Sequence, residues 1–564
     1  MNIKNRFRLF FAFLLLCVCS FAVYPQPARP NFNRVRTYDV QHYTVRISFD
    51  RANKRIFGDT IVQLKPLQNN FNRVELDAAN LDFESVEFAD GQNATFKTEG
   101  EKIDITLDKN YSPADLISIR FKYSAKPNKG VYFVRQNSAE KGIKHSAQIW
   151  TQGEPEEAHH WFPSYDFPDD KATSEQFITV EKNEIAIGNG ESLGVAQNAD
   201  GTKTFHYKMP TPHSTYLTSF VVGEYQKISD SYKNIPLNFY VYPGKEAVAL
   251  KANSQTKEMM RVFEELTGIN YPFNKYDQTV VANFDFGGME NITATTMADT
   301  EMFFNRPNEV EDLVSHELAH SWFGNMVTCK NWSELWLNEG FATFLEAAYR
   351  EKQYGRKDYL RKLRGDLNAF RADDAVNQNR HGLFNVLARP DKNLFDVTTY
   401  QKGGLVIHTL RETVGTENFW KAVNLYLTRH KFQNVETADL QKAMEEACKM
   451  DLDWFFRQWV YGAGYPKLEV KQFYNEQKKI LELNVEQMQE IDKITPEAFV
   501  LAVEIELTLK GGVKKFERIE IKKRQETFSI KLNGKPEKIV FDKDEKLPLV
   551  MIKTESLKNS HSGT

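Results

Sequence analysis

Residues 312–323 read Asp-Leu-Val-Ser-His-Glu-Leu-Ala-His-Ser-Trp-Phe, and this stretch decides how the rest of the chain is interpreted. Its pattern is helical. On a helix, His316 and His320 are four residues apart and share one face, so two imidazoles can bind one metal ion while Glu317 lies beside them. The spacing predicts a zinc site; the alternative is a pair of histidines on a helix surface.

A second helix is predicted to complete this site. Residues 332–342 read Trp-Ser-Glu-Leu-Trp-Leu-Asn-Glu-Gly-Phe-Ala and put the carboxylate of Glu339 near its start, although Glu339 could be only part of a helix start. Two histidines and one glutamate leave a fourth position on zinc for water, which is typical of catalytic sites. Zinc lowers the pKa of its water, and Glu317 can take the proton and deliver it to a leaving amine. We predict one catalytic Zn²⁺ per chain, bound by His316, His320 and Glu339, with Glu317 as the general base.

Hydrophobic periodicity divides the chain into three folded regions, which makes its fold class multidomain α+β. Apolar residues alternate with period two from Tyr38 onward and again beyond Pro466, which indicates strands. Between these regions helical patterns dominate, beginning with a predicted helix from Ala247 to Leu266. The predicted regions are an N-terminal antiparallel β domain (31–228), a mostly α catalytic domain (229–463), a small C-terminal β-sandwich domain (464–553) and a polar tail (554–564).

The first residues have the pattern of a secretory signal. Lys4, Arg6 and Arg8 precede an uncharged run from Leu9 to Val23, and small residues near its end suit a cleavage site. The run is shorter than the roughly 20 residues that a membrane span needs. We therefore predict a signal peptide over residues 1–22 and an exported protein, periplasmic or extracellular, with no stable membrane insertion after signal removal. A membrane-tethered form is the less favoured alternative.

Composition excludes several classes of protein. An aromatic content of 13% and a charged content of 26% are typical of a folded chain rather than a disordered one. Lys plus Arg (73) nearly balances Asp plus Glu (76), so the net charge of −3 provides no field that would gather nucleic acid. We therefore expect no nucleic-acid partner.

Several motifs occur in a fixed order around the predicted metal site. The sequence Gly-Gly-Met-Glu-Asn occupies residues 287–291, and 18 residues separate His320 from Glu339. Tyr-Gln-Lys-Gly occupies residues 400–403, and Gln-Gly-Glu-Pro occupies residues 152–155. In these motifs the chain resembles the M1 family of zinc aminopeptidases, which are gluzincins similar to aminopeptidase N. The resemblance covers most of the chain and implies a thermolysin-like catalytic domain.

The extra motifs are predicted to select the N-terminus of a peptide. Glu290, beside glycines that let the substrate come close to the backbone, can pair with a free α-ammonium group, and Glu154 can supply a second carboxylate. Two anionic groups at a fixed distance from zinc would hold the first peptide bond at the metal. In the family, the residue matched by Tyr400 hydrogen-bonds the oxyanion of the tetrahedral intermediate. The expected partners are peptides with a free N-terminus. The expected substrate-binding residues are Glu154, Gly287, Gly288, Met289, Glu290 and Asn291.

The chain departs from the family in two places. After the Glu154 motif, residues 158–164 read Ala-His-His-Trp-Phe-Pro-Ser where the family usually has an Arg and a Cys, so the support of Glu154 is expected to differ. The pair His159-His160 has no carboxylate at helical spacing, and we expect packed or solvated side chains rather than a second metal site. Many relatives continue as a helical domain that covers the active site. We expect a short form without it, whose more open cleft admits longer peptides.

Three alternatives to an aminopeptidase stay open. A thermolysin-like endopeptidase could share the four metal-site residues but has no use for Glu290. A leukotriene A4 hydrolase-like enzyme resembles the family but carries Gln at the position of Glu154. A metal-free binding scaffold is disfavoured by the intact metal motif and the export signal.

Overall fold

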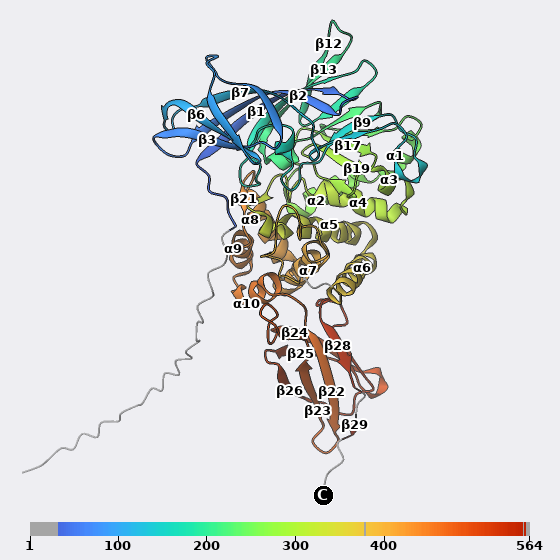
Figure 1. Ribbon diagram of the computed structural model, residues 1–564. Helices are drawn as coiled ribbons and strands as arrows, with labels where there is room; N and C mark the ends of the chain where they lie inside the picture. Colours follow the sequence, from blue (N-terminus) through green and yellow to red (C-terminus); the bar gives the residue numbers. More distant parts are fainter. Residues whose placement is uncertain (1–31, 377–379, 556–557, 560–564) are drawn as a thin grey trace, which may run out of the picture. The chain divides into compact units, whose positions relative to one another are not determined.

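The computed structural model describes most of the chain, namely residues 32–376, 380–555 and 558–559 (Figure 1). The predicted signal peptide, residues 1–22, lies outside the described residues. By its packing the chain divides into Met1–Phe32 and Asn33–Thr564, and every element named below belongs to the second unit. Among the described residues, no helix is both long and apolar enough to span a membrane.

An N-terminal β-rich domain forms where the alternating pattern predicts strands. In its first strand Tyr43, Val45 and Ile47 point inward and are buried, because successive side chains of a strand face opposite sides of the sheet. The largest sheet has seven strands, which in spatial order are β12 (Glu191–Gln197), β13 (Lys203–His213), β10 (Ala172–Val180), β1 (Tyr38–Asp50), β2 (Arg55–Pro66), β7 (Ile117–Ala125) and β4 (Leu81–Phe88).

The prediction of a purely antiparallel domain is wrong for one pair of strands. The neighbours β1 and β10 run parallel, with Tyr43 opposite Ser174, whereas β1 and β2 are antiparallel. A short turn forces the antiparallel arrangement, but a long connection permits a parallel one. More than one hundred residues separate β1 from β10, so their alternating patterns carry no information about direction.

Two smaller sheets complete this domain, and their apolar faces join those of the large sheet in one hydrophobic cluster. The first contains β3 (Phe71–Asp77), β6 (Lys102–Tyr111) and β5 (Thr95–Glu99). The second contains β11 (Ile185–Gly188), β14 (Phe220–Gly223), β9 (Gln148–Thr151) and β8 (Val131–Val134). The motif that carries Glu154 follows β9 directly, so this sheet determines where Glu154 enters the fold.

A five-stranded sheet introduces the helical catalytic domain. It contains both parallel and antiparallel pairs, and its third and fourth strands are the parallel pair β17 and β19. The predicted boundary between residues 228 and 229 lies inside its first strand, because the period-two pattern runs on without a break. In order the strands are β15 (Gln226–Tyr232), β16 (Ile235–Val241), β17 (Tyr276–Val281), β19 (Ala294–Ala298) and β18 (Gly288–Met289).

Helices make up most of the catalytic domain. The single helix predicted from Ala247 to Leu266 is wrong, because the structure divides it into α1 and α2 at Asn253. There the Asn253 amide donates to the carbonyl of Ala249 at 3.0 Å, and such side-chain bonds compete with continued helix. The helices are α1 (Glu246–Ala252), α2 (Thr256–Thr267), α3 (Asp299–Phe304), α4 (Pro307–Ala319), α5 (Trp336–Tyr354), α6 (Arg356–Asp374), α7 (Gly403–Val414), α8 (Thr416–Arg429), α9 (Thr437–Cys448) and α10 (Asp453–Phe456). The short strands β20 (Thr328–Cys329) and β21 (Asn434–Val435) pair in parallel.

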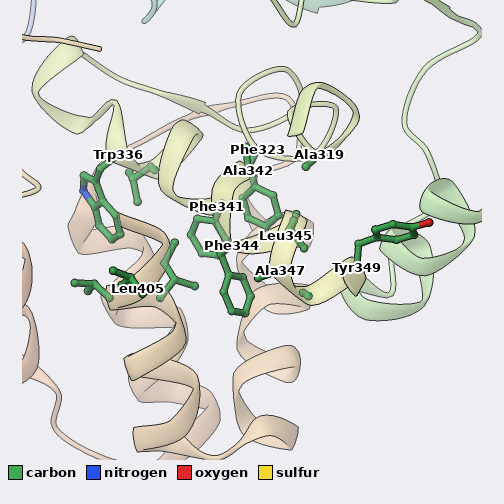
Figure 2. Packing of buried hydrophobic residues seen from close by; sticks show 14 of the residues in the cluster. Ala319, Phe323, Trp336, Phe341, Ala342, Phe344, Leu345, Ala347, Tyr349 and Leu405 are labelled. Atoms are coloured by element: carbon green, nitrogen blue, oxygen red, sulfur yellow. The ribbon is translucent and has the colours of Figure 1, made fainter. Parts of the chain in front are cut away.

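Helix α5 is the centre of the catalytic domain. Its first fifteen residues, Trp336 to Arg350, are all buried, and it packs against α4, α6 and α7. Figure 2 shows apolar side chains along α5, where the rings of Phe341 and Phe323 stack with centroids 4.2 Å apart. A helix enclosed in this way cannot shift easily, so it is a rigid support for any functional side chain it carries.

The strands after residue 467 form two sheets whose inner faces are buried. Val503, Ile505 and Leu507 alternate inward on one sheet, and a hairpin through Gly511-Gly512 connects two of its strands. Their apolar side chains continue the hydrophobic cluster of the catalytic domain. Within the predicted polar tail, β29 pairs with β22. The first sheet contains β26 (Gln525–Lys531), β23 (Ile480–Gln487), β22 (Lys467–Asn475), β28 (Met551–Thr554) and β29 (Lys558–Asn559). The second contains β25 (Lys514–Ile521), β24 (Leu501–Thr508) and β27 (Lys538–Phe541).

Candidate metal centre

Helices α4 and α5 bring the three predicted metal ligands together. His316 lies in the last turn of α4, and His320 follows that helix with helical backbone angles. Glu339 is the fourth residue of α5. One oxygen of Glu339, Oε2, lies 3.2 Å from Nε2 of His316 and 3.3 Å from Nε2 of His320. Three donor atoms from two packed helices therefore converge on one point.

The remaining nitrogen of each histidine is bonded elsewhere, which orients both rings. Nδ1 of His316 lies 2.8 Å from Oε1 of Glu346, and Nδ1 of His320 lies 2.9 Å from the carbonyl oxygen of Phe323. Each Nδ1 faces an acceptor and so carries a proton, which leaves Nε2 free to bind a cation. Glu346 is not among the predicted site residues, although its spacing could have indicated it. It lies seven residues after Glu339, on the same face of α5.

Glu317 lies beside this centre and is held against the backbone of β18. Its side chain is buried, and Oε2 has no hydrogen-bond partner among the described residues. A Cβ atom at position 288 would lie only 2.2 Å from Oε1 of Glu317, so a side chain there would displace this carboxylate. Burial raises the pKa of Glu317 to about 8. The carboxylate is thus positioned to accept a proton.

Two more carboxylates, Glu154 and Glu290, are buried in the same place. An oxygen of each has no hydrogen-bond partner among the residues described. Burial raises the pKa of both carboxyls, most strongly for Glu154, which also faces the charge of Glu290. Their backbones are held in place: the amide of Asn325 donates to the carbonyl of Glu290 at 2.8 Å, and that of Gln152 donates to the carbonyl of Glu154 at 3.2 Å.

The donor set fits a divalent cation. Burial raises the pKa of Glu339, but the charges and hydrogen bonds of His320 and His316 outweigh burial and lower it to about 2. Burial lowers the pKa of His316, yet its bonds to Glu339 and Glu346 raise it to about 9. The surrounding carboxylates thus favour positive charge between these side chains, which a bound cation would supply. Two imidazole nitrogens and one carboxylate oxygen are the ligands of catalytic zinc sites.

Tyr400 approaches the centre from a π-helical turn, Thr398–Lys402, that leads into α7. Its ring stacks on that of His316 with centroids 5.8 Å apart and planes 13° from parallel. Burial and the neighbouring charge of Glu339 raise the pKa of the phenol well above its usual value, so it stays a hydrogen-bond donor. Asp396 anchors the turn, because its side chain accepts from the Thr399 amide at 2.9 Å.

Two glycines determine how closely the turn of Tyr400 approaches α5. A Cβ at Gly403 would lie 2.9 Å from the Cα of Gly340, and a Cβ at Gly340 would lie 3.1 Å from the Cα of Gly403. Any side chain at either position would push the two backbones apart. Since Gly340 follows Glu339 directly and Gly403 lies three residues after Tyr400, this contact positions the phenol relative to the predicted metal ligands. No feature of the sequence indicated it.

All but one of the predicted site residues line a single cleft of about 500 Å³. The exception is Asn291, which is fully buried and donates to Thr296 Oγ1 at 3.0 Å, so it supports the motif from behind. Phe286 and Phe395 add an apolar wall, with ring centroids 5.6 Å apart. The site residues in the cleft are Glu154, Gly287, Gly288, Met289, Glu290, His316, Glu317, His320, Glu339 and Tyr400.

Two protein-family models match the chain. The model of the Peptidase M1 N-terminal domain matches residues 39–217, and that of the Peptidase family M1 domain matches residues 251–459. Together they cover more than half of the chain. The chain belongs to peptidase family M1.

Individual proteins named aminopeptidases are similar to much of the chain. Glutamyl aminopeptidase of Bos taurus is 30% identical over 418 residues, which are 68% of this chain and 43% of the relative. Glutamyl aminopeptidase of Homo sapiens is 33% identical over 368 residues, 62% of this chain and 38% of the relative. Probable aminopeptidase 1 of Saccharolobus solfataricus is 30% identical over 420 residues, 72% of this chain and 52% of the relative. The chain thus spans about half the length of the relatives that it matches.

Proposed function

We propose that this M1 protein is a zinc-dependent aminopeptidase that hydrolyses the N-terminal peptide bond of peptides. The observation that carries the proposal is the pair Glu154 and Glu290. Both are buried, each keeps an oxygen without a hydrogen-bond partner among the described residues, and carboxylate oxygens of both lie within 4.8 Å of one of Glu339. Similarity to proteins named aminopeptidases supports the same reaction.

Glu290 and Glu154 anchor the free α-ammonium group of the substrate. A buried carboxylate without a partner is costly, and an ammonium ion supplies both the missing charge and the missing hydrogen-bond donors. Because the anchor adjoins the candidate metal ligands, an amine held there has only its own peptide bond within reach of the reacting centre. The anchor therefore directs cleavage to the first bond.

His316, His320 and Glu339 hold zinc, as expected for a family of zinc metalloenzymes. When bound, zinc supplies a Lewis acid that polarises a carbonyl group and makes water acidic near neutral pH. Glu317 acts as the general base: it takes a proton from the attacking water and gives it to the leaving amine. Gly288 leaves room for this carboxylate beside the backbone of β18, and its Oε2 has no competing partner among the described residues.

Tyr400 stabilises the tetrahedral intermediate by donating a hydrogen bond from its phenol to the oxyanion. Burial among carboxylates keeps the phenol protonated, so it can donate when negative charge develops on the substrate. The bond forms with charge that the ground-state carbonyl lacks, so it accelerates the reaction more than it strengthens binding.

A comparison of free and N-acetylated substrates tests this function. Wild-type protein should cleave aminoacyl arylamides with a free amine at least about 100-fold faster than their acetylated forms, since acetylation removes the charge that Glu290 binds. Glu290→Gln should raise KM for the free amine and reduce the preference by about 10-fold or more. Both changes are measured as kcat and KM on matched substrate pairs.

Glu156→Gln is the matched control, because Glu156 belongs to the same segment as Glu154 but does not line the cleft. The control should keep the wild-type preference. Equal rates for acetylated and free substrates in the wild type would support a thermolysin-like endopeptidase instead. An unchanged preference in Glu290→Gln would remove the amine anchor from the mechanism.

We further propose that the protein is exported, on the basis of the basic and apolar pattern of residues 1–22. Fusion of residues 1–30 to a reporter that is active only after export tests this. Replacing Lys4, Arg6 and Arg8 with glutamate should reduce export, and an inactive wild-type fusion would contradict the proposal.

A further inference from the structure

Two histidines and one glutamate meet on the N-terminal β-rich domain, and none of them lines the catalytic cleft. His159 and His160 form a 3-10 turn with Ala158, and Glu101 lies in the turn between β5 and β6. A ring nitrogen of each histidine and a carboxylate oxygen of Glu101 lie within 4.8 Å of one another. The sequence could not indicate this group, because the carboxylate comes from a different sheet hairpin.

His159 is oriented toward Glu101 by a carboxylate on its other side. Its Nδ1 donates to Oδ2 of Asp166 at 2.7 Å, and its backbone amide donates to the same oxygen at 3.0 Å. The other oxygen of Asp166 accepts from Thr215 Oγ1 at 2.9 Å, which fixes Asp166 in turn. Nε2 of His159 then points toward Oε2 of Glu101, 3.7 Å away. A carboxylate behind a histidine is the usual support of a metal ligand.

His160 supplies a second imidazole. It is 5% exposed, and its buried Nδ1 has no hydrogen-bond partner among the described residues. Its ring lies against that of His159 with centroids 4.6 Å apart. A buried ring nitrogen without a partner is costly, so His160 is not fully satisfied by the protein alone.

The backbones that carry the three side chains are joined before any ligand binds. The amide of Ala78 donates to the carbonyl of Glu101 at 2.8 Å, and the amide of Ala79 donates to the carbonyl of His159 at 3.0 Å. Two successive residues therefore hold the β5–β6 turn and the histidine turn side by side. Only the Glu101 side chain, 66% exposed, is free to move.

The geometry points to a second metal site: we propose that Glu101, His159 and His160 bind a divalent transition metal ion of the zinc class. Bonds of about 2.0 Å at a tetrahedral angle put neighbouring ligand atoms about 3.3 Å apart, close to the separation of His159 and Glu101. Two imidazoles and one carboxylate suit zinc better than calcium or magnesium, which prefer oxygen ligands. Because Glu101 is near the solvent, water completes the coordination. The site shares no residue with the catalytic centre.

Zinc stoichiometry of the full-length protein tests this site. Metal-free protein is equilibrated with low micromolar free Zn²⁺, separated from unbound metal and measured by elemental analysis. The wild type should bind two ions per chain, whereas Glu101→Gln and His160→Gln should each bind one and keep arylamidase activity. The variant His316→Gln/His320→Gln should also bind one ion. Adding Glu101→Gln to it should abolish binding.

His206→Gln is the matched control, because His206 also pairs with a glutamate, Glu175, in this domain. It should keep two ions. Glu101 is largely exposed, so its variant should fold normally, as thermal unfolding followed by circular dichroism will show. One ion in the wild type that the variant His316→Gln/His320→Gln loses, or two ions in both Glu101→Gln and His160→Gln, would overturn the proposal. Loss of the catalytic ion alone affects only the proposed function, so the two failures are distinguishable.

Discussion

Asp77 and Asp166 in the β-rich domain differ from Glu154, Glu290 and Glu317 in the cleft in what they contact. Asp77, on β3, accepts two hydrogen bonds from the Arg34 guanidinium, at 2.6 and 2.5 Å, and a third from the backbone amide of Asp166 at 2.8 Å. Asp166 itself accepts from both His159 and Thr215. Each of these two carboxylates has both of its oxygens bonded.

In the cleft, Glu154, Glu290 and Glu317 are buried as deeply, yet each keeps an oxygen that has no partner among the described residues. Burying a charged group without partners destabilises the fold, so such groups persist where function requires them. The difference supports a structural role for Asp77 and Asp166 and the functional roles proposed for Glu154, Glu290 and Glu317. Each kind should respond differently to removal of its charge.

The largest expected effect is that of Glu317→Gln. Loss of the general base should lower kcat by about 10³-fold or more, while the melting temperature stays the same or rises because an unpaired buried charge is gone. Steady-state kinetics and calorimetry measure the two effects. Zinc content should remain that of the wild type. Activity within about tenfold of wild type would assign the base to another residue.

Tyr400→Phe should have the next largest effect. Removing the phenol hydroxyl should reduce kcat by about 10²-fold and leave KM nearly unchanged, because its hydrogen bond strengthens only as the oxyanion forms. Measuring kcat and KM of the wild type and the variant on one free-amine arylamide tests this prediction. An increase in KM with unchanged kcat would make Tyr400 a substrate-binding residue instead.

Asp77→Asn should act in the opposite way, on stability alone. The change leaves the Arg34 charge without its partner, and we expect a loss of about 2 kcal/mol in the free energy of unfolding. This is below the usual cost of breaking a buried pair, since a quarter of the Arg34 side chain contacts water. Urea unfolding measures the loss, and kcat/KM should not change. A loss of activity without a loss of stability would contradict the comparison.

Glu156 tests an intermediate case, since it is partly buried but bonded to Trp332 Nε1 at 2.7 Å. Burial, then the charge of Asp166, raises the pKa of Glu156 to about 7, while the Trp332 bond partly opposes them. The folded state therefore binds this proton more tightly than the unfolded state does. Protonated Glu156 stabilises the fold below about pH 4.5, and this stabilisation is lost as the pH rises through about 7. When the pH rises from about 5 to about 8, the free energy of unfolding of Glu156→Gln should fall by about 1 kcal/mol less than that of the wild type, as measured by urea unfolding. Equal losses would place Glu156 among the fully solvated carboxylates.

Local spacing predicted the parts of the molecule that depend on one helix or one strand. His316, Glu317 and His320 could be found because four residues make about one turn, and the strands could be found because side chains alternate. Glu346 follows the same helical logic and could have been included. The direction of β10, the break at Asn253 and the approach of Glu101 to His159 depend on contacts between distant segments or on competing side-chain bonds, which no periodicity records.

The contact between Gly340 and Gly403 bears on how the active site tolerates change. Where two side chains set a distance, a substitution or a change of rotamer can adjust it by fractions of an ångström. Here the spacing between the metal-ligand helix and the tyrosine turn is set by backbone against backbone, with no side-chain torsion available to absorb an error. The spacing at this crossing therefore does not depend on side-chain rotamers, and even one added methyl group at Gly403 would force a backbone to move.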